Sequence, residues 1–260
     1  MKNRKYLFVC GCPRSGTSAL VKLLNTHPSI ALGIERYKRY AKIDKIHGLT
    51  PGKFKSKSFF NIKPKQTNIN PSHKSWDLEW KEIYENLKIK FNRKDTIVGD
   101  KYPYYYRFYH EIDRAFNRPK WIFILRNVHE IASSYNVRAS NPHDRWKTTH
   151  NYIYAVKDWN ESLTKTWQYL ESGSKNLLIC EYEKLFYGNT QCLYQLLNFL
   201  NIRTNLVVEK YHQDMNQNWP ERLLKSQNLD FQQVKYIDAN ANWSLRDRLL
   251  KKYGHSCTLF

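Results

Sequence analysis

The sequence predicts an α/β fold, a three-layer sandwich in which helices cover both faces of a central parallel sheet. Short apolar runs typical of buried strands alternate along the chain with longer segments whose apolar residues recur at helical spacing. Strands and helices that alternate in this way form parallel sheets. In addition, the first strand leads through a turn rich in Gly, Ser and Thr into a helix, a strand–loop–helix unit similar to a P-loop.

The remaining elements follow from composition and from residues that bound helices. Four apolar runs have the composition of buried strands, at 5–11, 96–100, 120–127 and 176–183. Helices are predicted at 15–27, 103–116, 128–139, 147–170, 190–200 and 244–254. We expect residues 211–240 to form a loop with short helical turns. The ligand of such a sheet belongs at the carboxyl ends of its strands.

The whole chain, residues 1–260, is predicted to be a single domain. Its length suits one α/β domain with a sizeable core, and it contains neither internal repeats nor a long linker. Residues 37–95 include basic, irregular stretches such as GKFKSKSFF. We predict that these residues form a surface insertion near the mouth of the site.

The composition indicates a globular protein with anionic partners. The formal net charge is +20, and an excess this large favours nucleotides, nucleic acid, acidic glycans or a membrane surface. A general bias toward Lys, Asn, Ile and Tyr is the alternative explanation for the total charge. With 41% hydrophobic and 15% aromatic residues, the chain is unlike disordered proteins.

The cysteines and the apolar runs predict a cytoplasmic protein without a membrane span. None of the five cysteines forms a C-x-x-C pair, which argues against zinc or redox chemistry and fits a reducing compartment. The first residues lead directly into a strand, without the apolar core of a signal peptide. The longest apolar runs, YLFVC and WIFIL, are far shorter than the roughly 18 residues of a membrane span.

The turn after the first strand has the glycine spacing of a nucleotide-binding P-loop but lacks its lysine. Gly11 and Gly16 match the pattern G-x-x-x-x-G-K-[ST], whereas Thr17 stands in the lysine position and Arg14 lies within the loop. Such a loop presents unpaired backbone N–H groups to an anion, and arginine adds a donor fork that matches phosphate. We therefore predict a phosphate ester without a γ-phosphate as the ligand; an ordinary serine-capped turn is the alternative. The predicted binding residues are Pro13, Arg14, Ser15, Gly16, Thr17 and Ser18.

The segment CPRSGTSAL resembles the 5′-phosphosulfate loop of sulfotransferases that use 3′-phosphoadenosine 5′-phosphosulfate (PAPS). In that family a basic residue within the loop replaces the kinase lysine, and no metal is needed. A second family motif places Arg at the end of a strand and Ser eight residues later, where both hold the 3′-phosphate. Arg126 and Ser134 have that spacing here, and Arg138 shares the helix face of Ser134. The resemblance therefore implies that Arg126 and Ser134 bind PAPS, and the shared helix face adds Arg138 to the predicted binding residues.

Three further segments extend the resemblance to bacterial and tyrosylprotein-type members of the family. HPSIALGIERY resembles the segment in which a glutamate 21 residues after the loop arginine is the catalytic base, here Glu35. GDKYP resembles a stretch whose lysine supports the transferring group, here Lys101. LLICEYEKLF resembles a late strand followed by a tyrosine that lies near the adenine, here Tyr182. The implied catalytic residues are Glu35, Lys101 and Arg14.

The resemblance implies a sulfotransferase that moves a sulfuryl group from PAPS, its co-substrate, to a hydroxyl acceptor without a metal. A carbohydrate, a lipid head group, a small alcohol and a tyrosine are all open as acceptors. The basic insertion at 37–95, near the acceptor site, is compatible with an anionic acceptor. No nucleic-acid-binding motif accompanies its lysines, so a specific nucleic-acid partner is not expected. The sequence carries no indication of oligomeric state.

Two other functions stay open on the sequence alone. The first is a nucleotide or small-molecule kinase with a degenerate P-loop, for which Asp100 is the one fair candidate for an acidic Mg²⁺ ligand. The second is a non-catalytic protein of the same fold that binds an anion or nucleic acid. His129 is an alternative base, but its place at a helix start favours a capping or packing role.

Overall fold

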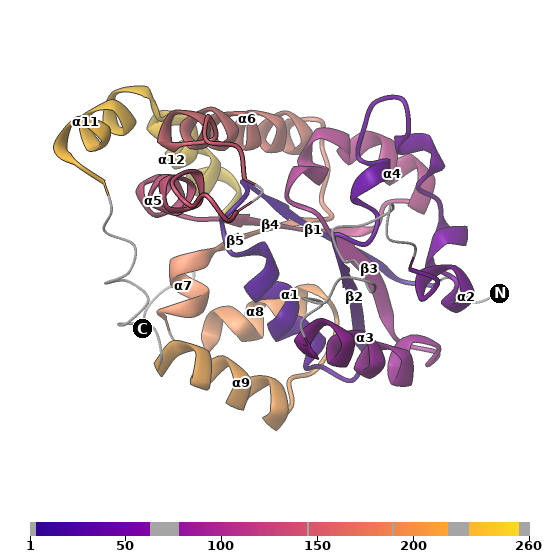
Figure 1. The fold of residues 1–260 in the computed structure, drawn as a ribbon. Helices are drawn as coiled ribbons and strands as arrows, with labels where there is room; N and C mark the ends of the chain where they lie inside the picture. The colour runs from indigo at the N-terminus through magenta and orange to yellow at the C-terminus, as the bar shows by residue number, and fades with distance from the viewer. Residues whose placement is uncertain (1–3, 63–77, 145, 189, 218–228, 255–260) are drawn as a thin grey trace.

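Five parallel strands form one sheet, in the order β2-β3-β1-β4-β5 (Figure 1). The computed structural model describes residues 4–62, 78–144, 146–188, 190–217 and 229–254. The strands are β1 (Tyr6–Gly11), β2 (Ile30–Ile34), β3 (Ile97–Lys101), β4 (Lys120–Leu125) and β5 (Leu177–Glu181). The predicted parallel sheet is therefore confirmed, with one strand more than the sequence pattern indicated.

β2 is the strand that the pattern did not reveal. Its sequence, IALGI, contains Ala and Gly, which are depleted in strands. All five of its residues are nevertheless buried, and the strand pairs with β3 from Ile30, opposite Ile97, to Ile34, opposite Lys101. Tertiary packing thus defines this strand, and the pairing brings the ends of β2 and β3 together.

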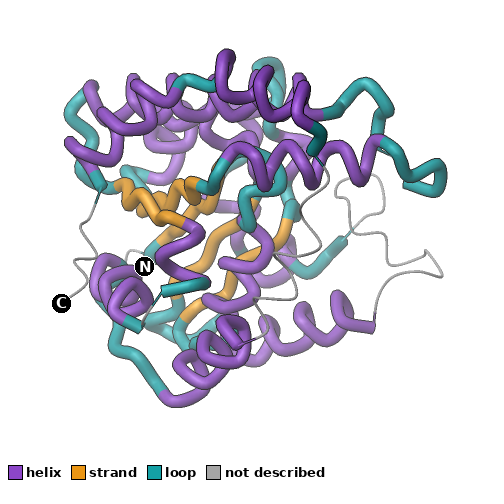
Figure 2. The backbone as a smooth tube through the Cα atoms, turned by 90° about the vertical axis from the view of Figure 1, so that its left-hand side faces the viewer, coloured by secondary structure: helices purple, strands orange, loops and turns teal. Residues whose placement is uncertain are grey.

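Helices cover both faces of the sheet, as Figure 1 shows and the perpendicular view of Figure 2 confirms. The helices of one face are α5 (Val128–Ala139), α6 (Tyr152–Glu171) and α12 (Trp243–Tyr253). Those of the other face are α1 (Thr17–Asn25), α8 (Gln191–Phe199) and α9 (Leu206–Gln217). Alternate residues of β1 serve the two layers, since Phe8 packs with the α5 and α6 side and Leu7 with the α1 and α8 side. The three-layer sandwich is confirmed.

The described parts of residues 211–240 correct the prediction of a loop. The second half of α9 lies there, and α11 spans Phe231–Asn240. Each helix buries few residues: Val208 and His212 in α9 and Ile237 in α11. With so little of each helix in the core, the sequence lacks the wide apolar stripe that predicts a helix.

The described parts of residues 37–95 are more ordered and more buried than an irregular surface insertion. They contain α2 (Ser56–Phe59) and α3 (Leu78–Phe91). Phe54, Phe59 and Phe91 are fully buried, and the Phe54 ring packs 5.8 Å from that of Phe8 in β1. Lys55 and Lys57, from the basic stretch, are exposed, whereas Lys90 is buried. The charge of the lysines suggested that residues 37–95 form a surface segment, whereas the buried aromatic residues make the described parts of this segment belong to the core.

The other helical segments are short. A 3₁₀ segment, Pro103–Phe108, precedes α4 (Tyr109–Phe116), and α7 (Tyr182–Phe186) follows β5 directly. Among the described cysteines, Cys10, Cys12 and Cys180 are buried free thiols. Cys192 is disulfide-bonded, which differs from the expectation of reduced cysteines. Among the described residues, every helix is too short or too polar to cross a bilayer.

Candidate functional site

The loop between β1 and α1 leaves a helix N-terminus open to an anion. The Ser15 N–H donates to Cys12 O at 3.0 Å, and the positive φ angles of Arg14 (69°) and Gly16 (93°) complete the turn. α1 then begins at Thr17 without a side-chain cap and without an acidic residue in its first turn. Its first N–H groups and the positive end of its dipole therefore favour a negatively charged ligand.

The predicted loop residues differ in how they face solvent. Arg14 is exposed, Gly16 and Ser18 are half-buried, and Pro13, Ser15 and Thr17 are buried. The Ser15 hydroxyl is enclosed and has no hydrogen-bond partner among the described residues. Ser15 thus shapes the turn, while its neighbours face the space where a ligand would lie.

Arginines from three segments converge on this loop. Arg14 Nε donates to Ser134 Oγ on α5 at 2.9 Å, and Arg126 Nη1 donates to Arg14 O at 3.1 Å. Partial desolvation of the guanidinium, followed by repulsion from Arg138 and Arg126, lowers the pKa of Arg14. The structure therefore brings together motif residues that lie more than 100 positions apart in the sequence.

Tyr182 packs between the loop and Arg126. The Arg126 guanidinium lies 4.3 Å from the centre of the Tyr182 ring, at cation–π distance. The ring also covers Gly16, where an added Cβ would lie 2.3 Å from Tyr182 Cε2. Only glycine fits at this position, because its φ of 93° and the close ring both exclude a side chain.

Two of the arginines already have acidic partners. Arg138 forms a bidentate pair with Asp144, at 2.6 and 2.7 Å, and lies 4.5 Å from the Trp146 ring centre. Arg126 Nε and Nη2 donate to Glu130 Oε2 at 2.8 and 2.5 Å. Sequence motifs identified these arginines but neither of their partners.

Glu35 and Lys101 form a second cluster at the ends of β2 and β3. Lys101 Nζ lies 3.0 Å from Glu35 Oε1, and the two side chains are 2% and 20% exposed. The Glu35 backbone has a φ of 55°, and its N–H donates to Lys101 O at 2.6 Å. Burial, with the nearby Glu35 charge, raises the pKa of Tyr102 to about 12. The pairing of β2 with β3 therefore places a carboxylate, an ammonium and a phenol in one corner of the sheet.

The carboxylate of Asp100, beside this pair, is occupied by hydrogen bonds from two backbone N–H groups and a tyrosine hydroxyl. Its carboxylate accepts from the N–H groups of Arg36 and Tyr37 at 3.0 and 2.9 Å, and from the Tyr105 hydroxyl at 2.8 Å. The side chain is fully buried, and burial raises its pKa to about 6. These donors leave it badly placed to be the acidic Mg²⁺ ligand of a kinase. Within the described part of the chain, no cluster of three or more His, Cys, Asp or Glu side chains could hold a metal.

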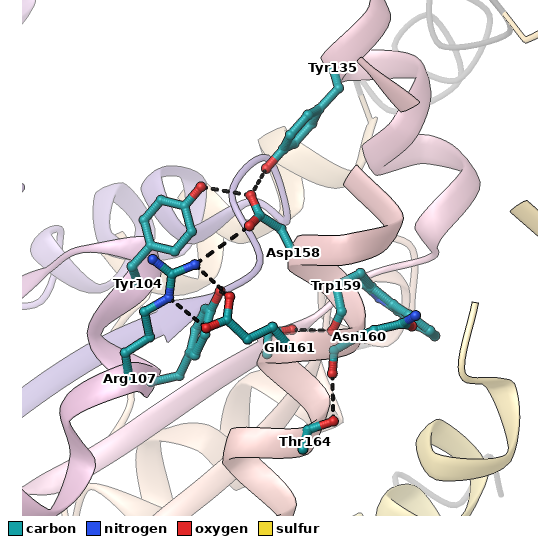
Figure 3. Close-up of polar contacts among 10 residues, drawn as sticks. Tyr104, Arg107, Tyr135, Asp158, Trp159, Asn160, Glu161 and Thr164 are labelled. Atoms are coloured by element: carbon teal, nitrogen blue, oxygen red, sulfur yellow. Dashed lines mark hydrogen bonds and ion pairs between the residues drawn. The ribbon is translucent and has the colours of Figure 1, made fainter. Parts of the chain in front are cut away.

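A buried carboxylate that the sequence analysis missed joins the two clusters. Asp158, on α6, accepts hydrogen bonds from Tyr104 at 2.7 Å and Tyr135 at 2.8 Å, and Figure 3 shows both hydroxyls directed at it. Arg107 lies 3.7 Å from Asp158 and pairs closely with Glu161. Burial raises the pKa of Asp158. In the sequence, Tyr135 follows Ser134 of the arginine cluster, and Tyr104 is two residues from Tyr102 of the Glu35–Lys101 cluster. The hydrogen bonds to Asp158 therefore connect segments that carry residues of both clusters.

His129, at the start of α5, contacts residues of α11 and α12. Its Nε2 lies 2.8 Å from Asp238 Oδ1, and its ring stacks with Trp243 at 5.7 Å. Its backbone N–H donates to the Asn127 side chain, which caps α5. These contacts agree with a packing role at the start of the helix.

One family model matches most of the chain. The model described as "Sulfotransferase family" matches residues 7–205. A search of curated proteins found no match. The sulfotransferase domain of the Synechococcus PCC 7002 olefin synthase is similar over 99% of this chain and 98% of its own, at 18% identity and a TM-score of 0.53.

Two further solved structures share the fold. Mouse sulfotransferase SULT7A1, complexed with PAP, is 14% identical, with 99% of this chain and 90% of that chain covered and a TM-score of 0.53. The sulfotransferase from Alicyclobacillus acidocaldarius is 16% identical, with 94% and 99% covered and a TM-score of 0.51. At these identities the likeness supports the fold alone.

Proposed function

Because the chain belongs to the sulfotransferase family, we propose that it transfers a sulfuryl group from PAPS to a hydroxyl acceptor. The observation that carries this proposal is the convergence of Arg14, Arg126 and Ser134 on the uncapped N-terminus of α1. A nucleotide with phosphates at both its 5′ and 3′ positions would use both the helix N-terminus and the arginines beside it. The presence of PAP in the mouse relative's structure gives independent support for this donor.

The donor's groups are assigned to the two sides of the loop. The 5′-phosphosulfate is assigned to the N–H groups at the start of α1, with Arg14, Thr17 and Ser18. The 3′-phosphate is assigned to Arg126 and Ser134, with Arg138 next to them. Tyr182, whose ring already covers Gly16 and Arg126, is assigned to the adenine side. Arg126 and Tyr182 fit this role because their side chains pack together beside the loop.

The Glu35–Lys101 pair is proposed to perform the transfer. PAPS supplies the sulfuryl group when bound. Glu35 accepts the proton of the acceptor hydroxyl, whose oxygen bonds to sulfur as the bond between sulfur and the phosphate oxygen breaks. Lys101 loses its ionic partner when Glu35 is protonated, so its charge becomes available to the sulfonyl and bridging oxygens, together with that of Arg14. Positioning and cationic stabilisation provide most of the catalysis, as in phosphoryl transfer.

Donor turnover tests this proposal. The protein is incubated with PAPS in EDTA and with a panel of acceptors: a phenol, a tyrosyl peptide, a small alcohol, a saccharide and a lipid head group. Chromatography then measures the 3′-phosphoadenosine 5′-phosphate that forms. We expect its formation to depend on one class of acceptor. Binding without product for every acceptor would favour a non-catalytic anion-binding protein, and phosphoryl transfer from ATP would favour a kinase.

The cytoplasmic location stays a prediction. Cys10, Cys12 and Cys180 are free thiols, which agrees with it, whereas the disulfide at Cys192 does not. Reactive thiols are counted in the denatured protein purified from its host, with and without reductant. Equal counts would support the cytoplasmic location, and a higher count with reductant would support a disulfide and contradict that location.

A further inference from the structure

The Arg126 guanidinium is held on three sides. Nε and Nη2 both donate to one oxygen of Glu130, and Nη1 donates to the Arg14 carbonyl. The face of the group packs over the Tyr182 ring. An arginine side chain carries five N–H groups, so these contacts leave one hydrogen on each terminal nitrogen. The terminal nitrogens of arginine are groups that donate to phosphate, so Arg126 keeps hydrogen-bonding capacity toward an anion.

Glu130 is itself fixed in place. It lies one turn after Arg126, at the start of α5, and the Arg126 and Glu130 side chains are only 14% and 16% exposed. The Tyr187 hydroxyl approaches the same Glu130 oxygen at 3.3 Å. The carboxylate that orients Arg126 is therefore held by a helix and by a second donor, and it does not move freely in solvent.

We propose that Glu130 is a positioning residue that presents Arg126 to the 3′-phosphate of the nucleotide. This inference rests on the proposed function, since that function supplies the 3′-phosphate. A free arginine side chain has many rotamers, and ordering it on binding costs affinity. Glu130 orders the guanidinium and leaves one hydrogen on each terminal nitrogen for the phosphate. The inference requires that the gain from this order exceed the repulsion between the carboxylate and the phosphate, which the affinities of the Glu130 variants measure.

Two substitutions separate position from charge. Glu130→Ala removes the oxygen that holds Arg126, whereas Glu130→Gln retains an acceptor oxygen but removes the charge. Calorimetry measures the Kd of each variant for 3′-phosphoadenosine 5′-phosphate and for adenosine 5′-phosphate, which lacks the 3′-phosphate. Glu171→Ala, which removes a surface partner of Lys252 far along α6, is the matched control. Thermal unfolding verifies that every variant is folded.

We expect Glu130→Ala to weaken binding of the doubly phosphorylated nucleotide about 10-fold and that of adenosine 5′-phosphate less than about 2-fold, as for a lost ordered charge contact. Glu130→Gln should stay within about 3-fold of the wild type for both ligands, and so should Glu171→Ala. Equal losses for both ligands, or unchanged or tighter binding by Glu130→Ala, would overturn the inference while the proposed function stands. A wild-type protein that does not bind the doubly phosphorylated nucleotide would overturn both.

Discussion

The site consists of two regions whose charges are balanced differently. The arginine region, at the ends of β1 and β4, contains Arg14, Arg126 and Arg138 with the carboxylates Glu130 and Asp144. The acceptor corner, at the ends of β2 and β3, is centred on the Glu35–Lys101 ion pair, and the Asp100 carboxylate and the Lys38 ammonium lie near it, so that its charges balance. An excess of cations attracts an anion and holds it. A matched pair attracts little by itself, and its charges become available only when a proton moves.

From this difference we infer that the arginine region binds the nucleotide and that the acceptor corner performs the transfer. Substitutions in the first should then change the affinity for the nucleotide, and those in the second should change turnover. Four predictions follow from this division, in order of decreasing effect.

Glu35→Gln should lower kcat by about 10²- to 10⁴-fold, the range for a lost general base, with unchanged affinity for the nucleotide. The amide keeps the shape and the contact with Lys101 but cannot accept a proton. Turnover with the best acceptor of the panel, and calorimetry with 3′-phosphoadenosine 5′-phosphate, measure the two quantities. Part of the lost rate should return at high pH, where the acceptor ionises unaided. Near-normal turnover by this variant would mean that the base lies elsewhere.

Arg126→Ala should weaken nucleotide binding by about 1.5–3 kcal/mol, the scale of hydrogen bonds to charged groups. The fold should persist, because the residue lies at the end of β4 and its guanidinium does not belong to the apolar core. Calorimetry measures the loss, and Arg246→Ala, which removes an exposed partner of Asp247, is the control. Unchanged affinity would remove Arg126 from the 3′-phosphate site.

Gly16→Ala should reduce nucleotide affinity about 10-fold, because the new Cβ displaces Tyr182 and with it the face that supports Arg126. Gly173→Ala is a matched control: its φ of 85° imposes similar backbone strain, but no atom lies within 4 Å of the added Cβ. Gly173→Ala should lose about 1 kcal/mol of stability in thermal unfolding, as expected for a side chain at positive φ, and Gly16→Ala should lose more, because its Cβ also displaces Tyr182. Equal affinities would show that the Tyr182 contact is irrelevant to binding.

Substitution of Lys90 should change the stability of the fold and leave the affinity for the nucleotide unchanged. Its ammonium donates to Asn25 O and His27 O, at the end of α1 opposite the loop. Burial lowers its pKa to about 8 from 10.5, so between those values the unfolded chain binds more protons and stability rises with pH. Relative to Lys90→Met, the wild type should gain on the order of 1–2 kcal/mol between pH 8 and 10 in chemical unfolding. A difference in unfolding free energy between the wild type and Lys90→Met that does not change between pH 8 and 10 would contradict the lowered pKa of Lys90.

The sequence predicted the arginine region better than the acceptor corner. Arg14, Arg126 and Ser134 stand in local motifs next to strongly apolar strands, and strand ends in a parallel sheet lie together. Glu35 and Lys101 were named from a resemblance, but their contact depends on β2, a strand with too little β propensity to be predicted from its residues. The register of β2 with β3 creates that contact.

The acidic partners were beyond prediction for a similar reason. Glu130 lies at helical spacing from Arg126, a signal that was available in the sequence but is common on exposed helices. Asp158 looked like one polar residue in a long helix, and its burial depends on Tyr104 and Tyr135, which come from two other segments. Such networks are tertiary, so no local pattern indicates them.

Calorimetry with 3′-phosphoadenosine 5′-phosphate, with Mg²⁺ and with EDTA, tests the binding role of the arginine region most directly. Cations of the protein provide the charge in this region, so the Kd should be the same in both buffers, and ATP should bind at least about 10-fold more weakly because it lacks the 3′-phosphate. An absolute requirement for a divalent metal, or equal affinity for ATP, would contradict the assignment of this site to the sulfotransferase donor.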